Sequence, residues 1–239
     1  MPYGYYGYGY GYGAGMNTSY ILLVVVSLVI GLATQAYIKS TYRKWSGVRA
    51  SVPGSGAEVA RRMLDEGGAR DIGIDCIGGE LTDNFNPADG CLHLSSANFS
   101  GASVASVAVA CHEAGHAVQA AKGFSMYRLR TLLVPAVNLA SSAWMIVLMA
   151  GVFMNAMGLV KVAILLFAAT VVFSLVTLPV EIDASRRAVA YLGKYGSGLD
   201  QKGARQVLIA AALTYVAAAL VSILQLVYLL GQYGDRDRR

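Results

Sequence analysis

Residues 111–117 read Cys-His-Glu-Ala-Gly-His-Ala and contain the pattern HExxH, formed by His112, Glu113 and His116. Two of the three histidines in the chain fall within this pattern. On a helix, both imidazoles lie one turn apart on the same face and can reach one zinc ion, while Glu113 is offset toward a water on that ion. The pattern therefore predicts a metalloprotease core with Glu113 as the catalytic base. The alternative is two histidines packed in a core beside an unrelated glutamate.

Long apolar runs indicate that this motif belongs to a membrane protein. Hydrophobic residues make up 56% of the chain and charged residues 14%. Four runs are each close to the ~20 residues that cross ~30 Å of hydrocarbon. They cover residues 20–38, 131–154, 159–180 and 206–230. The predicted fold class is therefore a predominantly α membrane protein with about four transmembrane helices and a small α+β zincin-like domain that carries HExxH.

The basic residues predict the orientation of these helices. Of the 19 Lys and Arg residues, 10 fall between the first and second runs and 5 between the third and fourth. Positive residues are retained on the inside, so the HExxH segment is expected in the cytoplasm, on the inner face of the plasma membrane. The basic residues flank membrane spans, so the net charge of +5 does not indicate nucleic-acid binding. Three cysteines in a reducing compartment predict no disulfide framework.

The HExxH helix could itself cross the bilayer, because residues 102–121 are rich in Ala and Val. Basic residues stand on both sides of it, including Arg70 before it and Lys122 after it, so only an even number of crossings fits. Three ionisable groups also make insertion unfavourable. A helix resting at the membrane surface is the favoured interpretation.

A short series of elements is expected before this helix. Ser55 and Glu58 form a capping-box pattern that opens a helix, which ends at Gly67-Gly68. Alternating apolar residues at 72–76 predict a strand, residues 83–90 a loop, and residues 91–94 a second strand. This order of elements is that of a minimal zincin, and the edge of its hairpin is a place where a peptide substrate could add as a strand.

A catalytic zinc site needs a third protein ligand, and few residues qualify. After His116 the chain has no further histidine, and Asp200 lies in what reads as an exposed loop. Glu181 and Asp183 remain, with Glu181 favoured. Two predicted spans separate His116 from Glu181, so Glu181 returns to the side of the HExxH helix. Pro179 precedes it, where a fresh helical segment can start.

Other polar residues could support the zinc or the reaction. Ser185 shares a helical face with Glu181 and could orient a ligand; Asp183 points elsewhere and is a second such candidate. His93 is a weaker choice for the third ligand, because a lone histidine on a strand is more often a packing or surface residue. Candidates for stabilising an oxyanion are Tyr215, His93, Arg186 and Arg187.

Four stretches carry a resemblance to a known family: residues 79–95, 112–117, 178–188 and 211–226. Together they resemble the bacterial membrane-bound neutral zinc metallopeptidases typified by YugP, over nearly all of residues 39–230. The resemblance implies a gluzincin-like site with one Zn²⁺ per chain held by His112, His116 and Glu181, and Glu113 as base. The HtpX-like proteases are more distantly similar; they usually carry Asp where this chain has Ser185.

The expected organisation follows the chain in seven parts. A disordered Gly/Tyr tail (1–16) precedes a transmembrane helix (17–38) and a cytoplasmic zincin-like domain with the HExxH helix (39–130). Transmembrane helices two and three (131–180) lead to a cytoplasmic segment with the third ligand (181–205), a fourth transmembrane helix (206–231) and a charged tail (232–239). The predicted function is a zinc metalloendopeptidase that cleaves membrane-associated proteins or peptides with a zinc-activated water. The alternative is a non-hydrolytic scaffold or chaperone stabilised by zinc.

Overall fold

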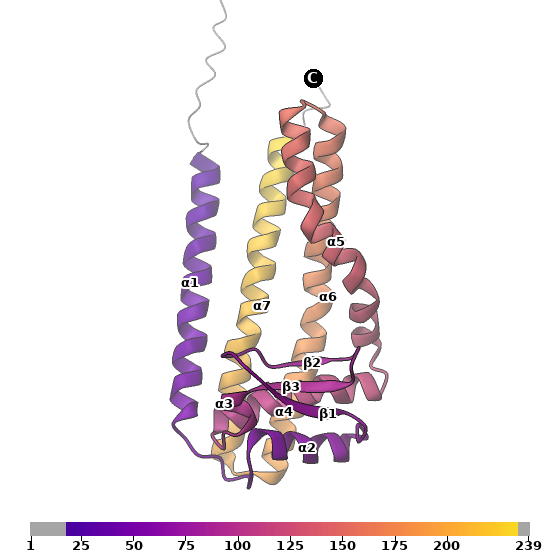
Figure 1. The fold of residues 1–239 in the computed structure, drawn as a ribbon. Coiled ribbons are helices and arrows are strands. Elements are labelled where there is room, and N and C mark those ends of the chain that lie inside the picture. Colours follow the sequence, from indigo (N-terminus) through magenta and orange to yellow (C-terminus); the bar gives the residue numbers. More distant parts are fainter. Residues whose placement is uncertain (1–17, 234–239) are drawn as a thin grey trace, which may run out of the picture.

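The computed structural model describes residues 18–233, and four long helices dominate it (Figure 1). Each is long and apolar enough to cross a membrane, which confirms the four predicted helices. They are α1 (Thr18–Ser46), α5 (Ser125–Phe153), α6 (Met157–Tyr195) and α7 (Gly198–Tyr233). The predicted tail at residues 1–16 and most of the charged tail at 232–239 lie outside the described residues.

All four helices extend beyond their apolar runs, and α6 differs most from the prediction. It continues through Pro179 to Tyr195, so no fresh helical segment begins before Glu181. A proline removes one backbone donor, and the surrounding packing can hold the helix together through that single loss. The C-terminal part of α6 and the N-terminal part of α7 therefore extend past the apolar runs, and a short connection joins them.

A small α+β domain sits at one end of the long helices (Figure 1). It contains α2 (Gly56–Gly67), α3 (Ser96–Phe99) and α4 (Val104–Ala121), with three short strands between α2 and α3. The predicted capping box is present: Glu58 N donates to Ser55 Oγ, and the Glu58 carboxylate accepts from Ser55 N. Gly68 ends α2 in a left-handed conformation with φ of 80°.

The three strands form one sheet in the order β1-β3-β2. β1 (Gly73–Ile77) runs parallel to β3 (Cys91–Ser95), and β2 (Asn84–Asn86) runs antiparallel to β3. Part of the segment predicted as a loop at residues 83–90 is therefore a strand. Its sequence, Asn-Phe-Asn, has low intrinsic strand preference, so its conformation comes from pairing with β3.

The core of the domain lies between the sheet, α2 and α4. Leu92 and Leu94 of β3 are fully buried, as are Leu64 of α2 and Val107 of α4. Because alternate residues of a strand face opposite sides, the other face of β3 carries Cys91, His93 and Ser95.

The HExxH helix α4 lies across the long helices and does not run alongside them (Figure 1). It is not one of the four helices suited to crossing a membrane. Protein packs against it on several sides, from α2, α6 and α7. Its burial therefore comes from the rest of the chain.

Asp200 corrects one sequence interpretation. It does not lie in an exposed loop: it stands in the first turn of α7 with 2% of its surface exposed. Its carboxylate accepts hydrogen bonds from the backbone nitrogens of Ser51 and Ser197, at 3.0 and 3.2 Å. A buried carboxylate is tolerated when backbone donors satisfy it, and Asp200 thereby joins the start of α7 to the segment before α2.

Candidate metal centre

Helix α4 places the two motif histidines side by side. Ser103 caps its N-terminus by accepting a hydrogen bond from Ser106 N, and the helix continues without a break to Ala121. His112 and His116 are therefore one turn apart, and their ring centroids are 4.8 Å apart in an edge-on arrangement.

Helix α6 brings Glu181 to these histidines because α4 and α6 approach very closely. At Gly115, between the two histidines, an added Cβ would stand 2.9 Å from the carbonyl oxygen of Ala184. Only glycine allows this approach without displacement. The glycine within HExxH thus allows α6 to bring Glu181, the candidate third ligand, close to the two histidines.

Three side chains converge on a common point, and we call His112, His116 and Glu181 the helix cluster. One ligand atom from each lies within 4.8 Å of the others. Glu181 Oε2 is 3.3 Å from His112 Nε2 and 3.5 Å from His116 Nε2. The second oxygen, Oε1, is buried without a hydrogen-bond partner. Two imidazoles and one buried carboxylate, whose Oε1 has no hydrogen bond and only a longer contact of 3.6 Å with Arg130, are a donor set that fits a catalytic zinc ion.

A chain of hydrogen bonds fixes the orientation of His116. Gln119 Nε2 donates to the Val180 carbonyl and to Asp183 Oδ2, both at 2.8 Å. Its Oε1 is thereby left to accept from His116 Nδ1, at 3.0 Å. Arg187 Nε in turn donates to Asp183 at 2.6 Å. His116 Nδ1 therefore carries the proton, and its Nε2 is free to bind a metal.

The side chain of Ser185 contacts the Nδ1 atom of His112. Its Nδ1 is 3.2 Å from Ser185 Oγ, and its Nε2 faces Glu181. Ser185 thus lies where the sequence suggested a supporting group, four residues after Glu181. Asp183 also reaches the site, through Gln119. Sequence reasoning did not identify Gln119, although its place three residues after His116 put it on the same side of α4.

Glu113 faces a cleft of about 220 Å³ beside the helix cluster. The walls come from α1, the segment before β2, α4 and α7, and include His112 and Tyr215. Burial raises the pKa of Glu113, although the neighbouring histidines oppose this effect. A carboxylate with an elevated pKa at the edge of a cleft is suited to taking and returning a proton.

Of the residues that the sequence suggested for stabilising an oxyanion, one lines the cleft and the others lie elsewhere. Tyr215 lines the cleft, whereas Arg186 is exposed on α6 and Arg187 pairs with Asp183. His93 lies on the sheet, with Nε2 3.0 Å from Asp89 Oδ2. The structure adds Arg130 of α5, whose Nη1 is 3.6 Å from Glu181 Oε1.

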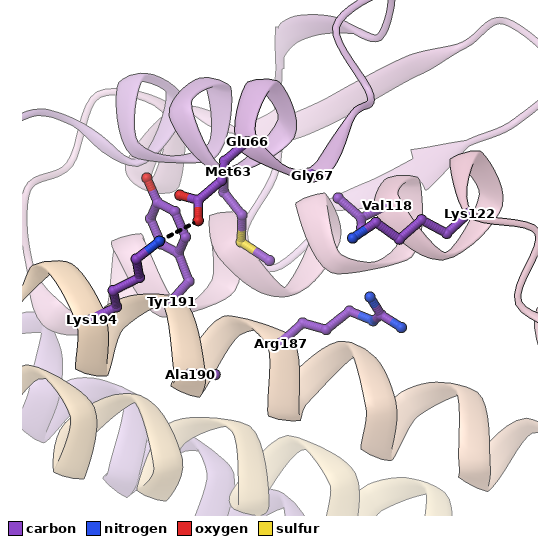
Figure 2. Close-up of a pocket in the computed structure, with 9 residues that line it drawn as sticks. All are labelled: Met63, Glu66, Gly67, Val118, Lys122, Arg187, Ala190, Tyr191 and Lys194. Atoms are coloured by element: carbon purple, nitrogen blue, oxygen red, sulfur yellow. Dashed lines mark hydrogen bonds and ion pairs between the residues drawn. The ribbon is translucent and has the colours of Figure 1, made fainter.

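A second hollow of about 290 Å³ lies between α2, α4 and α6 (Figure 2). Its walls carry Lys122, Arg187 and Lys194, and Lys194 pairs with Glu66 at 2.6 Å. No ligand of the helix cluster lines it. Arg187 also pairs with Asp183, which contacts Gln119, and the cleft that Glu113 lines is a separate space.

Two comparisons with known proteins bear on this site. Residues 20–233 match the protein family described as "Putative neutral zinc metallopeptidase". The chain belongs to this family. It is 39% identical over 209 residues to the "Putative membrane protease YugP" of Bacillus subtilis (strain 168), covering 87% of this chain and 93% of that protein. No solved structure matches the chain.

Family membership confirms the resemblance found in the sequence and gives zinc as the cofactor. The apolar helices and the membrane relative together place the protein in a lipid bilayer. The protein is therefore a membrane member of a zinc peptidase family.

Proposed function

We propose that this protein is a zinc metalloendopeptidase that hydrolyses peptide bonds of membrane-associated proteins or peptides. The observation that carries the proposal is the convergence of His112, His116 and Glu181 beside a cleft that Glu113 lines. A purely structural zinc site is closed by a fourth protein ligand and has no use for a carboxylate next to an open position.

The mechanism follows from the roles of these side chains. Zinc, when bound, lowers the pKa of a water and polarises a substrate carbonyl. His112 Nε2, His116 Nε2 and Glu181 would hold the ion, with the histidines oriented by Ser185 and Gln119. Glu113 takes a proton from the attacking water and returns it to the departing amine. Tyr215, on the cleft wall, is a candidate for stabilising the oxyanion.

The composition of the cleft supports a substrate drawn from the membrane. Two of its walls, at Ile38 and at Tyr215, belong to the membrane helices α1 and α7. A third wall includes Leu81 and Asp83, immediately before β2. Because β2 is an edge strand, an extended peptide can pair with it while its scissile bond lies over α4. The distribution of Lys and Arg favours a site on the cytoplasmic face of the plasma membrane.

Replacement of Glu113 by Gln tests this function. The full chain, purified in detergent and loaded with zinc, is assayed for metal content and for cleavage of a fluorogenic peptide library. We expect Glu113→Gln to retain zinc and to lose cleavage by about a hundredfold to ten-thousandfold, because only the proton acceptor is removed.

Glu66→Gln provides the matched control, because Glu66 is an exposed glutamate of α2 paired with Lys194. It should leave metal content and cleavage unchanged. Undiminished cleavage by Glu113→Gln would exclude the proposed mechanism. A zinc-loaded wild-type chain that cleaves no peptide would favour the non-hydrolytic scaffold instead.

A further inference from the structure

A second group of metal-binding side chains lies on the outer face of the small sheet, and we call Asp75, Cys91 and His93 the sheet cluster. Asp75 of β1 pairs directly with His93 of β3. Cys91 is two residues before His93, so its side chain projects from the same face. One ligand atom from each of the three lies within 4.8 Å of the others.

The contacts within the sheet cluster leave one nitrogen of His93 free for a ligand. Cys91 Sγ is 3.2 Å from Asp75 Oδ2. His93 Nε2 is 3.0 Å from Asp89 Oδ2, while Nδ1 is buried and has no hydrogen-bond partner. Metal-binding histidines commonly donate their other ring N–H to a carboxylate, which sets the tautomer and strengthens the free nitrogen as a ligand. The Asp89–His93 contact has this form.

The turn before β3 holds Asp89 in place for this contact. Asn86 Nδ2 donates to Asp89 Oδ2 at 2.7 Å, and the backbone nitrogen of Cys91 donates to Oδ1 at 2.9 Å. Asp89 does not belong to the set of mutually close ligand atoms, so it would support His93 through Nε2 and would not bind the metal itself. The cluster is thus supported in the same way as the histidines of α4.

A thiol, an imidazole and a carboxylate could also form a hydrolytic triad, and the environment of Cys91 argues against this. Cys91 Sγ donates to the Asp75 carboxylate at 3.2 Å. A nucleophilic cysteine is instead paired with the base that takes its proton, usually an imidazole. A cation is the partner that would convert this thiol to a ligand, because it replaces the thiol proton.

We propose that the sheet cluster binds a second Zn²⁺ ion through Cys91 Sγ, His93 Nδ1 and an Asp75 oxygen. Sulfur, nitrogen and oxygen donors in one small set suit a borderline-soft ion that accepts tetrahedral coordination, with solvent as the fourth ligand. Binding forms the bond from sulfur to zinc and releases the Cys91 proton to solvent. The ion links β1 to β3 independently of the helix cluster, and its solvent-occupied fourth position distinguishes this site from a structural zinc site closed by four protein ligands. Because zinc binds the folded domain, its binding raises the stability of that domain.

The experiment removes the helix cluster and asks whether a thiolate site remains. The full chain with His112→Ala and His116→Ala is purified in detergent, without a histidine tag, then stripped with chelator and reloaded with Zn²⁺ or Co²⁺. We expect one zinc per chain, a higher melting temperature with zinc than without, and a near-ultraviolet band from thiolate-to-cobalt charge transfer. The wild-type chain should bind two zinc ions.

Two cysteine variants assign the site. Cys91→Ser should abolish the charge-transfer band. It should also lower the zinc content by one ion per chain, both in the wild-type chain and in the chain with His112→Ala and His116→Ala. Cys76→Ser is the matched control, because Cys76 is on β1 next to Asp75 and its thiol lies against Ser96, on the opposite side of the strand. It should change neither quantity.

Three results would overturn the proposal: no metal in the double-histidine chain, cobalt binding without a thiolate band, or a band that survives Cys91→Ser. Should the double-histidine chain fail to fold, the wild-type chain gives the same answer, because Cys91→Ser must lower its zinc content from two to one. Should Cys91→Ser itself fail to fold, His93→Asn replaces it and must abolish binding at this site.

Discussion

The helix cluster and the sheet cluster assemble similar donors in different ways. The ligands of the helix cluster come from α4 and α6, which are distant in sequence and meet where Gly115 contacts Ala184. The ligands of the sheet cluster come from two neighbouring strands and are aligned by their register. Glu181 is buried, whereas Asp75 is exposed. The difference teaches that the proposed catalytic site depends on tertiary packing, while strand pairing alone gathers the proposed ligands of the sheet cluster.

Of the variants considered, Glu181→Ala should cause the largest loss of zinc affinity, and only at the helix cluster. Measured in a Cys91→Ser background, Glu181→Ala should weaken zinc binding at the helix cluster by more than about a hundredfold, because the loss of a ligand exceeds the loss of a supporting hydrogen bond. Zinc content is determined by competition with a chelator.

Asp183→Ala is the informative comparison for Glu181→Ala, since Asp183 was the alternative third ligand. It contacts Gln119 and Arg187 and should weaken binding by a smaller factor. A larger loss with Asp183→Ala would reverse the assignment of the two carboxylates.

Gln119→Met should have the next largest effect, and on the helix cluster alone. The substitution keeps the size of the side chain and removes the acceptor that fixes the tautomer of His116. Loss of such a partner typically weakens metal affinity or activity by about tenfold to a hundredfold. Zinc competition assays measure the effect, with the exposed Gln201→Met as control. Equal loss of metal from the sheet cluster would indicate general unfolding.

Local patterns in the sequence were sufficient to predict the helical HExxH motif, the capping box and the four long helices. HExxH needs only the helical repeat, and an apolar run of sufficient length identifies a membrane helix without knowledge of its neighbours. Counting membrane crossings was enough to bring Glu181 to the side of His116, and the structure places the two side chains together.

Features that depend on distant partners could not be found in this way. β2 forms because β3 offers a pairing edge, and Asp200 is buried because two backbone nitrogens reach it. The Gln119–Asp183 contact exists only because α4 crosses α6. The metal-binding potential of His93 required the register that places it opposite Asp75. A lone histidine on a strand carries no such information in the sequence.

Gly115→Ala should disturb the helix cluster, which depends on the packing of α4 against α6, and leave the sheet cluster, which depends on strand register, unchanged. The new Cβ would stand 2.9 Å from the Ala184 carbonyl oxygen and 3.1 Å from its Cα, so α4 and α6 must move apart. Such crowding costs about 1–3 kcal/mol of the free energy of unfolding, partly offset by the better helix propensity of alanine. Chemical unfolding in mixed micelles measures the change.

Gly158→Ala is the control for Gly115→Ala, because no atom lies within 4 Å of its Cβ position on α6. It should be neutral or slightly stabilising. Zinc affinity should fall only in Gly115→Ala and only at the helix cluster, since strand register does not depend on this crossing. An unchanged zinc affinity would mean that the crossing does not position the ligands.

Asp89→Asn should have the smallest effect, confined to the sheet cluster. The amide is close in shape to the carboxylate but lacks the charge that strengthens His93 Nδ1 as a ligand through the contact at Nε2. Cobalt affinity in the double-histidine chain should fall about tenfold, the lower end of the range for such partners, because Asp89 is exposed and solvent compensates in part. Asp65→Asn removes an equivalent exposed charge on α2 and should leave cobalt affinity unchanged. Equal losses in both variants would mean that long-range charge, and not the orientation of His93, governs the site.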